Sequence, residues 1–253
     1  MNGFAVFARK EALEILRTWR RWVLPGILGF FAVSGPPLAR YTPQIVKAFA
    51  GDQLAGLTIP APTYLDAYTQ WAKNLTQVVL FALIIIYGGL VSAESRSGTA
   101  VLVLTKPVAR SAFVLVKALV NMAFVAVLLV GGTLLTWALT AAMFGAAPAA
   151  GLWGSALVWL VLAVQLIALM TLLSVLIGSA AGAAGAGLGA YVLVSIAAIW
   201  KPLGSYSPAG LASQVTGLAA GTAAAPLWPV LTSLLLSALL VGGAAVLFRR
   251  KEL

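Results

Sequence analysis

Long apolar runs, separated by short polar or Gly/Pro-rich segments, dominate the chain. No charged residue occurs between Lys117 and Lys201, and none occurs between Lys201 and Arg249. A membrane-spanning helix needs roughly 20 consecutive apolar residues, so both stretches are long enough to cross a bilayer. The pattern predicts an all-α integral membrane protein in which a single domain of six spans fills residues 1–253. The spans are expected at 22–38, at 75–93, three times within 118–200, and at 227–248.

Helix-breaking residues divide the long uncharged stretch. One helix over 118–200 would be about 125 Å long, far more than a bilayer accommodates. Pro148, within residues 145–151, predicts the first turn, and the glycine-rich run 178–187 predicts the second.

The segments outside the spans have their own patterns. Residues 1–21 place Phe4, Ala8, Ala12, Ile15 and Trp19 three to four positions apart, which predicts an amphipathic helix lying in the membrane interface. A signal peptide is the alternative, but charges interleaved with apolar residues are not typical of one. Residues 40–73 form a polar connection after the first span. Residues 201–226, apolar but broken by Gly and Pro, predict a re-entrant or interfacial outer hairpin.

Composition supports the same class of protein. Hydrophobic residues make up 62% of the 253 positions and charged residues only 9%, against about 45–50% and 25% in soluble domains. Soluble enzymes and nucleic-acid binders are therefore excluded. The net charge of +10 comes from basic residues that flank apolar runs, where they orient spans. With the N-terminus inside, 12 of the 16 lysines and arginines lie on the inner side, so both termini are predicted to be cytoplasmic.

The chemistry available to the chain is limited. It contains no Cys and no His, and it lacks the phosphate-binding GxxxxGK[ST] loop. Spans three to six contain no ionisable residue, and no intramembrane candidate lies deeper than Glu94 at a membrane boundary. We therefore expect no catalytic residue, no metal site and no cofactor in this chain. A transport activity would take its energy from a partner.

Scattered polar residues are weak candidates for a substrate pathway, namely Gln165, Thr136 and Asn121. A cavity lined by such isolated polar groups among apolar residues would suit an apolar or amphipathic substrate. Equally, Gln165 could bond across to another helix, and the hydroxyls could bond carbonyls within their own helices.

The cytoplasmic segment 94–117 is the most informative. Gly98 permits a break after the second span, Thr99 can cap a short helix over 100–104, and Pro107 ends it. The apolar run that includes Leu102 and Leu104 would then face the cytosol, which favours a partner's groove as its docking site.

Here the chain resembles the permeases of the type-2 ABC exporter family. The pattern E-x3-G-T, an apolar stretch and K-P-V-x-R carries the resemblance, which a F-A-R-K-E stretch at 7–11 and the segments 66–77 and 206–211 extend. The matching positions are Glu94, Gly98, Thr99, Pro107 and Arg110. The resemblance implies that residues 94–117 hold a coupling helix and that residues 1–21 form an elbow helix.

The resemblance also implies partners. These are two copies of a cytoplasmic ABC ATPase subunit that binds ATP and Mg, and a second permease half, expected to be identical. The expected location is the cell (inner) membrane of a bacterium or archaeon. The alternative function is a non-transporting membrane scaffold or an assembly factor for another complex.

Overall fold

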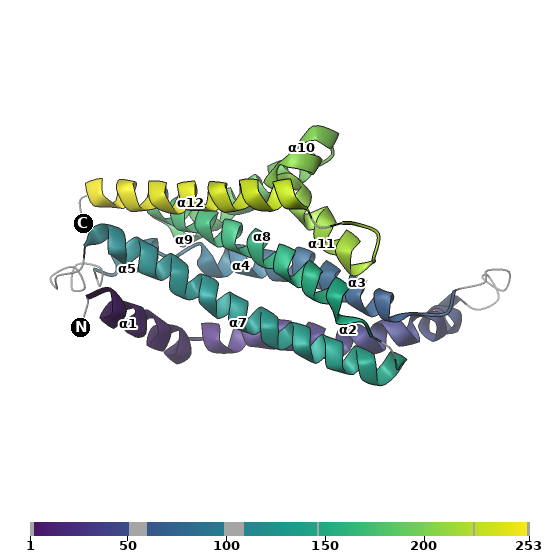
Figure 1. Ribbon diagram of the computed structural model, residues 1–253. Coiled ribbons are helices and arrows are strands. Elements are labelled where there is room, and N and C mark those ends of the chain that lie inside the picture. The colour runs from purple at the N-terminus through teal and green to yellow at the C-terminus, as the bar shows by residue number, and fades with distance from the viewer. Residues whose placement is uncertain (1–2, 51–59, 99–108, 146, 225, 252–253) are drawn as a thin grey trace.

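Helices arranged as an elongated bundle make up the molecule in the computed structural model (Figure 1). The structure describes residues 3–50, 60–98, 109–145, 147–224 and 226–251. Within these ranges every regular element is helical, and six helices are long and apolar enough to cross a membrane. The prediction of an all-α, six-span, multi-pass membrane protein is thereby confirmed.

The first two helices differ in length from the prediction. An amphipathic helix, α1 (Gly3–Arg17), precedes α2 (Arg20–Ala50). The span expected to end at residue 38 instead continues through Pro36 and Pro37. Prolines are tolerated in membrane helices because neighbouring helices and hydroxyl side chains satisfy the freed backbone groups. Here α2 packs along the second and third spans.

The second span starts earlier than predicted. It is built from α3 (Tyr64–Asn74), the π-helical turn η2 (Leu75–Val79), α4 (Leu80–Tyr87) and, after a break, α5 (Ser92–Arg96). Asp66 accepts hydrogen bonds from the backbone N–H and the hydroxyl of Thr63, which fixes the helix start. The expected polar connection 40–73 is therefore helical at both of its ends.

The later spans follow the predicted order. They are α7 (Arg110–Phe144), α8 (Ala149–Leu176), α9 (Ala180–Ala197) and α12 (Leu227–Arg250). The turn predicted around Pro148 is present. The run 178–187 is mostly helical, however, because Ser179 caps α9 by accepting the Gly182 N–H, so the turn is much shorter than predicted.

The predicted outer hairpin consists of short helices, α10 (Lys201–Tyr206), η3 (Pro208–Gly210) and α11 (Leu211–Ala219). Buried Leu211 and Val215 of α11 pack into the bundle against α8 and α3.

A continuous apolar core surrounds α8, which packs against α12, α11, α7 and α4. Its largest members are fully buried aromatic side chains, Trp71, Trp159, Tyr68 and Tyr87. Because the number of spans is even, both termini lie at one end of the bundle, together with α5 and the start of α7 (Figure 1). We call this the terminal end.

Candidate functional site

A break between α4 and α5 sets the direction in which α5 leaves the membrane core. At Gly88 the backbone of α9 approaches so closely that a Cβ atom would lie 2.5 Å from the Ala180 carbonyl oxygen. The break frees two backbone N–H groups, those of Val91 and Ser92. Both donate to the Ser174 Oγ of α8, at 2.9 and 3.0 Å. Since a buried, unpaired N–H is costly, this hydroxyl stabilises the break.

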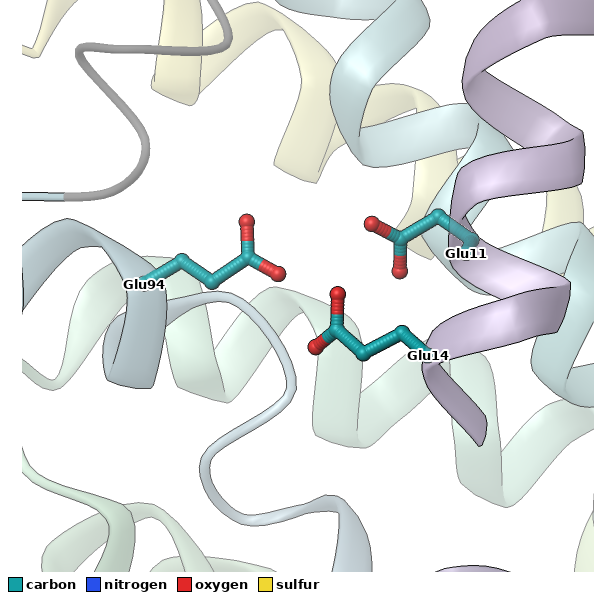
Figure 2. Close-up of side chains that lie close together, drawn as sticks. All are labelled: Glu11, Glu14 and Glu94. Atoms are coloured by element: carbon teal, nitrogen blue, oxygen red, sulfur yellow. The ribbon is translucent and has the colours of Figure 1, made fainter. Parts of the chain in front are cut away.

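Beyond the break, α5 carries Glu94 into a group of charged side chains. Lys117 of α7 donates to Glu94 Oε1 at 2.5 Å and to Glu11 Oε2 of α1 at 2.9 Å. Lys10 lies 3.2 Å from Glu94 Oε1, 2.9 Å from Glu11 Oε1 and 2.5 Å from Glu14 Oε2. Figure 2 shows the three carboxylates pointing toward one another from α1 and α5. We call these five residues the ion-pair cluster.

The ion-pair cluster has a buried and a solvated side. The side chains of Lys117 and Glu11 are only 3% and 4% exposed, whereas those of Lys10 and Glu14 are 41% and 38% exposed. Removing one partner of a buried ion pair leaves an uncompensated charge in a medium of low dielectric constant. The buried side therefore holds α1 and α5 to α7.

The solvated side has perturbed pKa values. Burial acts to lower the pKa of Lys10, but its hydrogen bonds with Glu14 and Glu11 and the charge of Glu94 outweigh burial and raise that pKa above its usual range. Burial likewise acts to raise the pKa of Glu14. Its hydrogen bond from Lys10 and the charge of Lys117 outweigh burial, and the pKa is lowered.

The three carboxylates could also be considered as metal ligands. Their oxygens lie within 4.8 Å of one another, as they would around a divalent cation. The two lysine ammonium groups, however, already contact all three carboxylates and offset most of their charge. A cation would have to displace both lysines, so the geometry favours an ion-pair network over a metal centre.

A stack of three phenylalanines adjoins the ion-pair cluster. Phe113 of α7 stacks on Phe7 of α1 and on Phe248 of α12, with ring centroids 5.3 Å apart in both pairs. Lys117 lies over the Phe113 ring at 5.2 Å, and Lys10 lies over the Phe7 ring at 5.5 Å. Charged and aromatic contacts therefore fix the same pair of helices, α1 and α7.

The end of α12 is attached to the same region. Arg110 donates to the backbone carbonyls of Lys251 and Arg249, at 2.9 and 3.4 Å. Lys251 donates in turn to the Val175 carbonyl of α8 at 2.8 Å. Five helices (α1, α5, α7, α8 and α12) are thus connected at the terminal end.

Of the predicted coupling residues, three are in the described part of the chain. Glu94 belongs to the ion-pair cluster, Arg110 binds the end of α12, and Gly98 has a φ of 73°, a left-handed conformation that favours glycine. The others lie outside the described residues, namely Thr99, Leu102, Leu104 and Pro107, together with the short helix predicted over 100–104.

The candidate pathway residues are not gathered at one point. Asn121 donates to the Lys117 carbonyl and Thr136 to the Gly132 carbonyl, both within α7 and about 22 Å apart along it. Gln165 of α8 accepts a hydrogen bond from Ser233 of α12. The sequence left two alternatives to a substrate pathway open, and both bonds are present. Thr136 bonds a carbonyl within its own helix, and Gln165 bonds across to another helix.

Sequence reasoning missed the partnership of Glu11 and Lys117. It treated Lys117 as a boundary residue and residues 1–21 as an interfacial helix. The sequence does contain a signal for this partnership, because Phe7, Glu11 and Ile15 recur every four residues and form the buried stripe of α1. Of the predicted apolar face, Ile15 is buried, while Phe4 and Trp19 remain 46% and 54% exposed.

The family described as "Protein of unknown function (DUF2705)" matches residues 54–252. The chain belongs to this family. The DUF2705 match covers the second to sixth spans and includes Glu94 and Lys117 of the ion-pair cluster, while α1 lies outside it. No curated protein matches the chain.

The DUF2705 match corrects the resemblance proposed from sequence. We expected a type-2 ABC exporter permease, but the family found is DUF2705, and no permease family of that kind is detected. The motifs that carried the resemblance are short, and Gly, Thr, Pro and Arg serve as breakers and caps in any loop that leaves a membrane.

Proposed function

We propose that this chain is the membrane-spanning subunit of a transport complex driven by a separate cytoplasmic ATPase. The observation that carries the proposal is the position of Glu94. It lies on α5, just before Gly98 and the segment 99–108, and its carboxylate pairs with lysines from α1 and α7. A force applied to that segment would therefore act on two further helices.

The break at Gly88 supports a moving α5. Ser174 satisfies the two freed N–H groups with a single hydroxyl oxygen, an arrangement that tolerates small rotations of α5 better than a continuous helix would. In the proposed mechanism, ATP binding moves the partner against segment 99–108. The movement is transmitted through Glu94 to Lys117 and Lys10, and so to α7 and α1.

The energy source follows from what the sequence lacks. The chain has no phosphate-binding loop, and no charged residue lies between Lys117 and Lys201 or between Lys201 and Arg249. We therefore propose that the partner binds ATP and Mg. Leu102 and Leu104 of this chain are the residues on which we propose that the partner docks. The proposal places both termini and the ion-pair cluster on the cytoplasmic side of a bacterial or archaeal cell membrane.

The substrate we propose is apolar or amphipathic and leaves the cell through a pathway shared with a second, identical copy. The support is the largely apolar composition of α7, α8 and α12, whose polar side chains Gln165, Asn121 and Thr136 are already bonded within the chain.

The test begins with the tagged chain purified from its native membrane in a mild detergent. We expect a stoichiometric ATPase in the complex, and we expect Leu102→Asp to remove it, because an apolar groove does not accept an unpaired charge. The matched control is Thr222→Asp, at an exposed position in the loop between α11 and α12. It should retain the ATPase.

A second variant tests whether Glu94 transmits the movement of the ATPase to α7 and α1, rather than whether the ATPase docks. With Glu94→Gln we expect the complex to assemble, while ATP turnover loses its stimulation by hydrophobic substrates. Asp66→Asn, an acid-to-amide change on α3, is the control. A complex that contains no ATPase would instead favour the alternative function, a non-transporting scaffold.

A further inference from the structure

An apolar groove runs between α1 and α7, beside the ion-pair cluster. Its volume is about 500 Å³, within the range of about 300–1,000 Å³ typical of small-molecule sites. Small side chains leave it open, and its walls are almost wholly hydrocarbon. The walls include Ala8, Ala12 and Leu16 of α1, with Ala123, Phe124 and Val127 of α7.

The groove opens where lipid would lie. Leu16 and Val127 on its walls are 53% and 70% exposed, and neighbouring Leu119 is 52% exposed. Trp19 and Trp22, both more than half exposed, follow at the end of α1, at the depth that tryptophan prefers in a membrane interface. An occupant would thus have its apolar part toward the spans and its polar part at the level of α1.

The positive charge of Arg9 beside the groove determines which kind of headgroup the occupant would carry. Arg9 lines the groove, and no carboxylate among the described residues forms an ion pair with it. Both acidic residues of α1, Glu11 and Glu14, are already paired with lysines. The guanidinium of Arg9 is therefore available to an anion, and arginine binds phosphate groups with a bidentate geometry.

We propose that this groove binds one anionic phospholipid, with an acyl chain between α1 and α7 and the headgroup phosphate on Arg9. The inference does not depend on the proposed transport function. A bound lipid would complete the apolar contact between α1 and α7, which the Glu11–Lys117 ion pair already joins. It would thereby brace the helix that carries three of the five charged groups of the ion-pair cluster.

The test uses the full chain in detergent micelles supplied with equal amounts of phosphatidylglycerol and phosphatidylcholine. Native mass spectrometry should show one phosphatidylglycerol retained per chain in preference to phosphatidylcholine. With Arg9→Gln, retention of phosphatidylglycerol should fall to the level of phosphatidylcholine. Arg250→Gln, an exposed arginine at the same end of the molecule, is the matched control and should keep the preference.

A second variant separates the groove from general surface charge. Ala12 is exposed and lines the groove, so Ala12→Trp should fill the space without disturbing the core. We expect this variant to lose the retained lipid while α1 keeps its place. Equal retention of both lipids by the unaltered chain, or an unchanged preference in Arg9→Gln, would overturn the proposal. So would efficient cross-linking between two chains carrying Ala12→Cys, which would show a second copy in the groove.

Discussion

Lys117 joins two carboxylates that come from different helices, and its side chain is almost completely buried. Its Nζ donates to Glu11 of α1 and to Glu94 of α5. In the sequence, Lys117 is the last charged residue before a long apolar run. That position is typical of a lysine that anchors a span at the membrane interface. Its burial depends on how α1 folds back against α7, which is a tertiary contact that no local pattern encodes.

We expect Lys117→Met to destabilise the protein by about 3 kcal/mol. Breaking a buried ion pair typically costs about 3–5 kcal/mol, and Lys10 remains beside both carboxylates, which favours the lower value. The measurement is the midpoint of thermal unfolding in nanodiscs. Lys47→Met, an exposed lysine on α2, is the control. Adding Glu11→Gln to Lys117→Met should recover part of the loss, because it removes a buried carboxylate that has lost its buried partner.

The pH dependence of stability provides a second test at this scale. The lowered pKa of Glu14 means that its contribution is present above its ordinary pKa and is lost as the pH falls through the lowered value. The raised pKa of Lys10 means that its contribution is lost only as the pH rises beyond its ordinary value of 10.5.

Thermal stability should therefore be level near neutral pH and should fall below about pH 4. Glu14→Gln should make that acidic decline shallower than in the unaltered chain. If the unfolding temperatures of the two proteins fell identically at acidic pH, Glu14 would not contribute to stability through its lowered pKa.

Among the elements, the broken second span depends on a close helix approach. Gly88→Ala would place a methyl group 2.5 Å from the Ala180 carbonyl oxygen, so α4 and α9 would have to separate. We expect a loss of about 1–3 kcal/mol, as for other overpacked cores. Gly131→Ala is the matched control, because its added methyl meets no atom within 4 Å and favours the α7 helix. Equal unfolding midpoints in the two variants would refute the close approach.

Element boundaries were predictable where a single residue decided them and were missed where packing decided them. The turn at Pro148 and the bounds of the last span follow from local chemistry. In contrast, Pro36 and Pro37 do not end α2, which continues to Ala50 and packs along the second and third spans. The run 178–187 stays helical because alanines separate its glycines and Ser179 caps it. Asp66, within the predicted polar connection 40–73, fixes the start of α3 by accepting the Thr63 N–H.

The candidate site was only partly predictable for a related reason. Glu94 was identified from its place at the end of an apolar run. Its partners were not, since the stripe of Phe7, Glu11 and Ile15 has meaning only once α1 lies against α7. Charge pairing across helices is invisible to a periodicity that is measured within one helix.

At the scale of the whole molecule, the arrangement of the ends determines what a cytoplasmic partner can contact. Both termini, α5 and the ion-pair cluster lie at the terminal end, and the connection from α10 to α11 lies toward the other end (Figure 1). The proposed function therefore requires the terminal end to be cytoplasmic. The excess of lysine and arginine there favours that orientation, since basic residues concentrate in cytoplasmic segments.

Single cysteines can test this orientation cleanly, because the natural chain contains none. In intact cells, Ser205→Cys on α10 should react with an impermeant thiol reagent, since Ser205 is exposed near the opposite end. Ser97→Cys, just after α5, should react only once the membrane has been opened. Both variants should label equally in detergent, which controls for local access. If Ser97→Cys labelled in intact cells and Ser205→Cys did not, the ion-pair cluster would face outward. A cytoplasmic ATPase could not then reach segment 99–108, and the proposed transmission through Glu94 would be impossible whatever the complex contains.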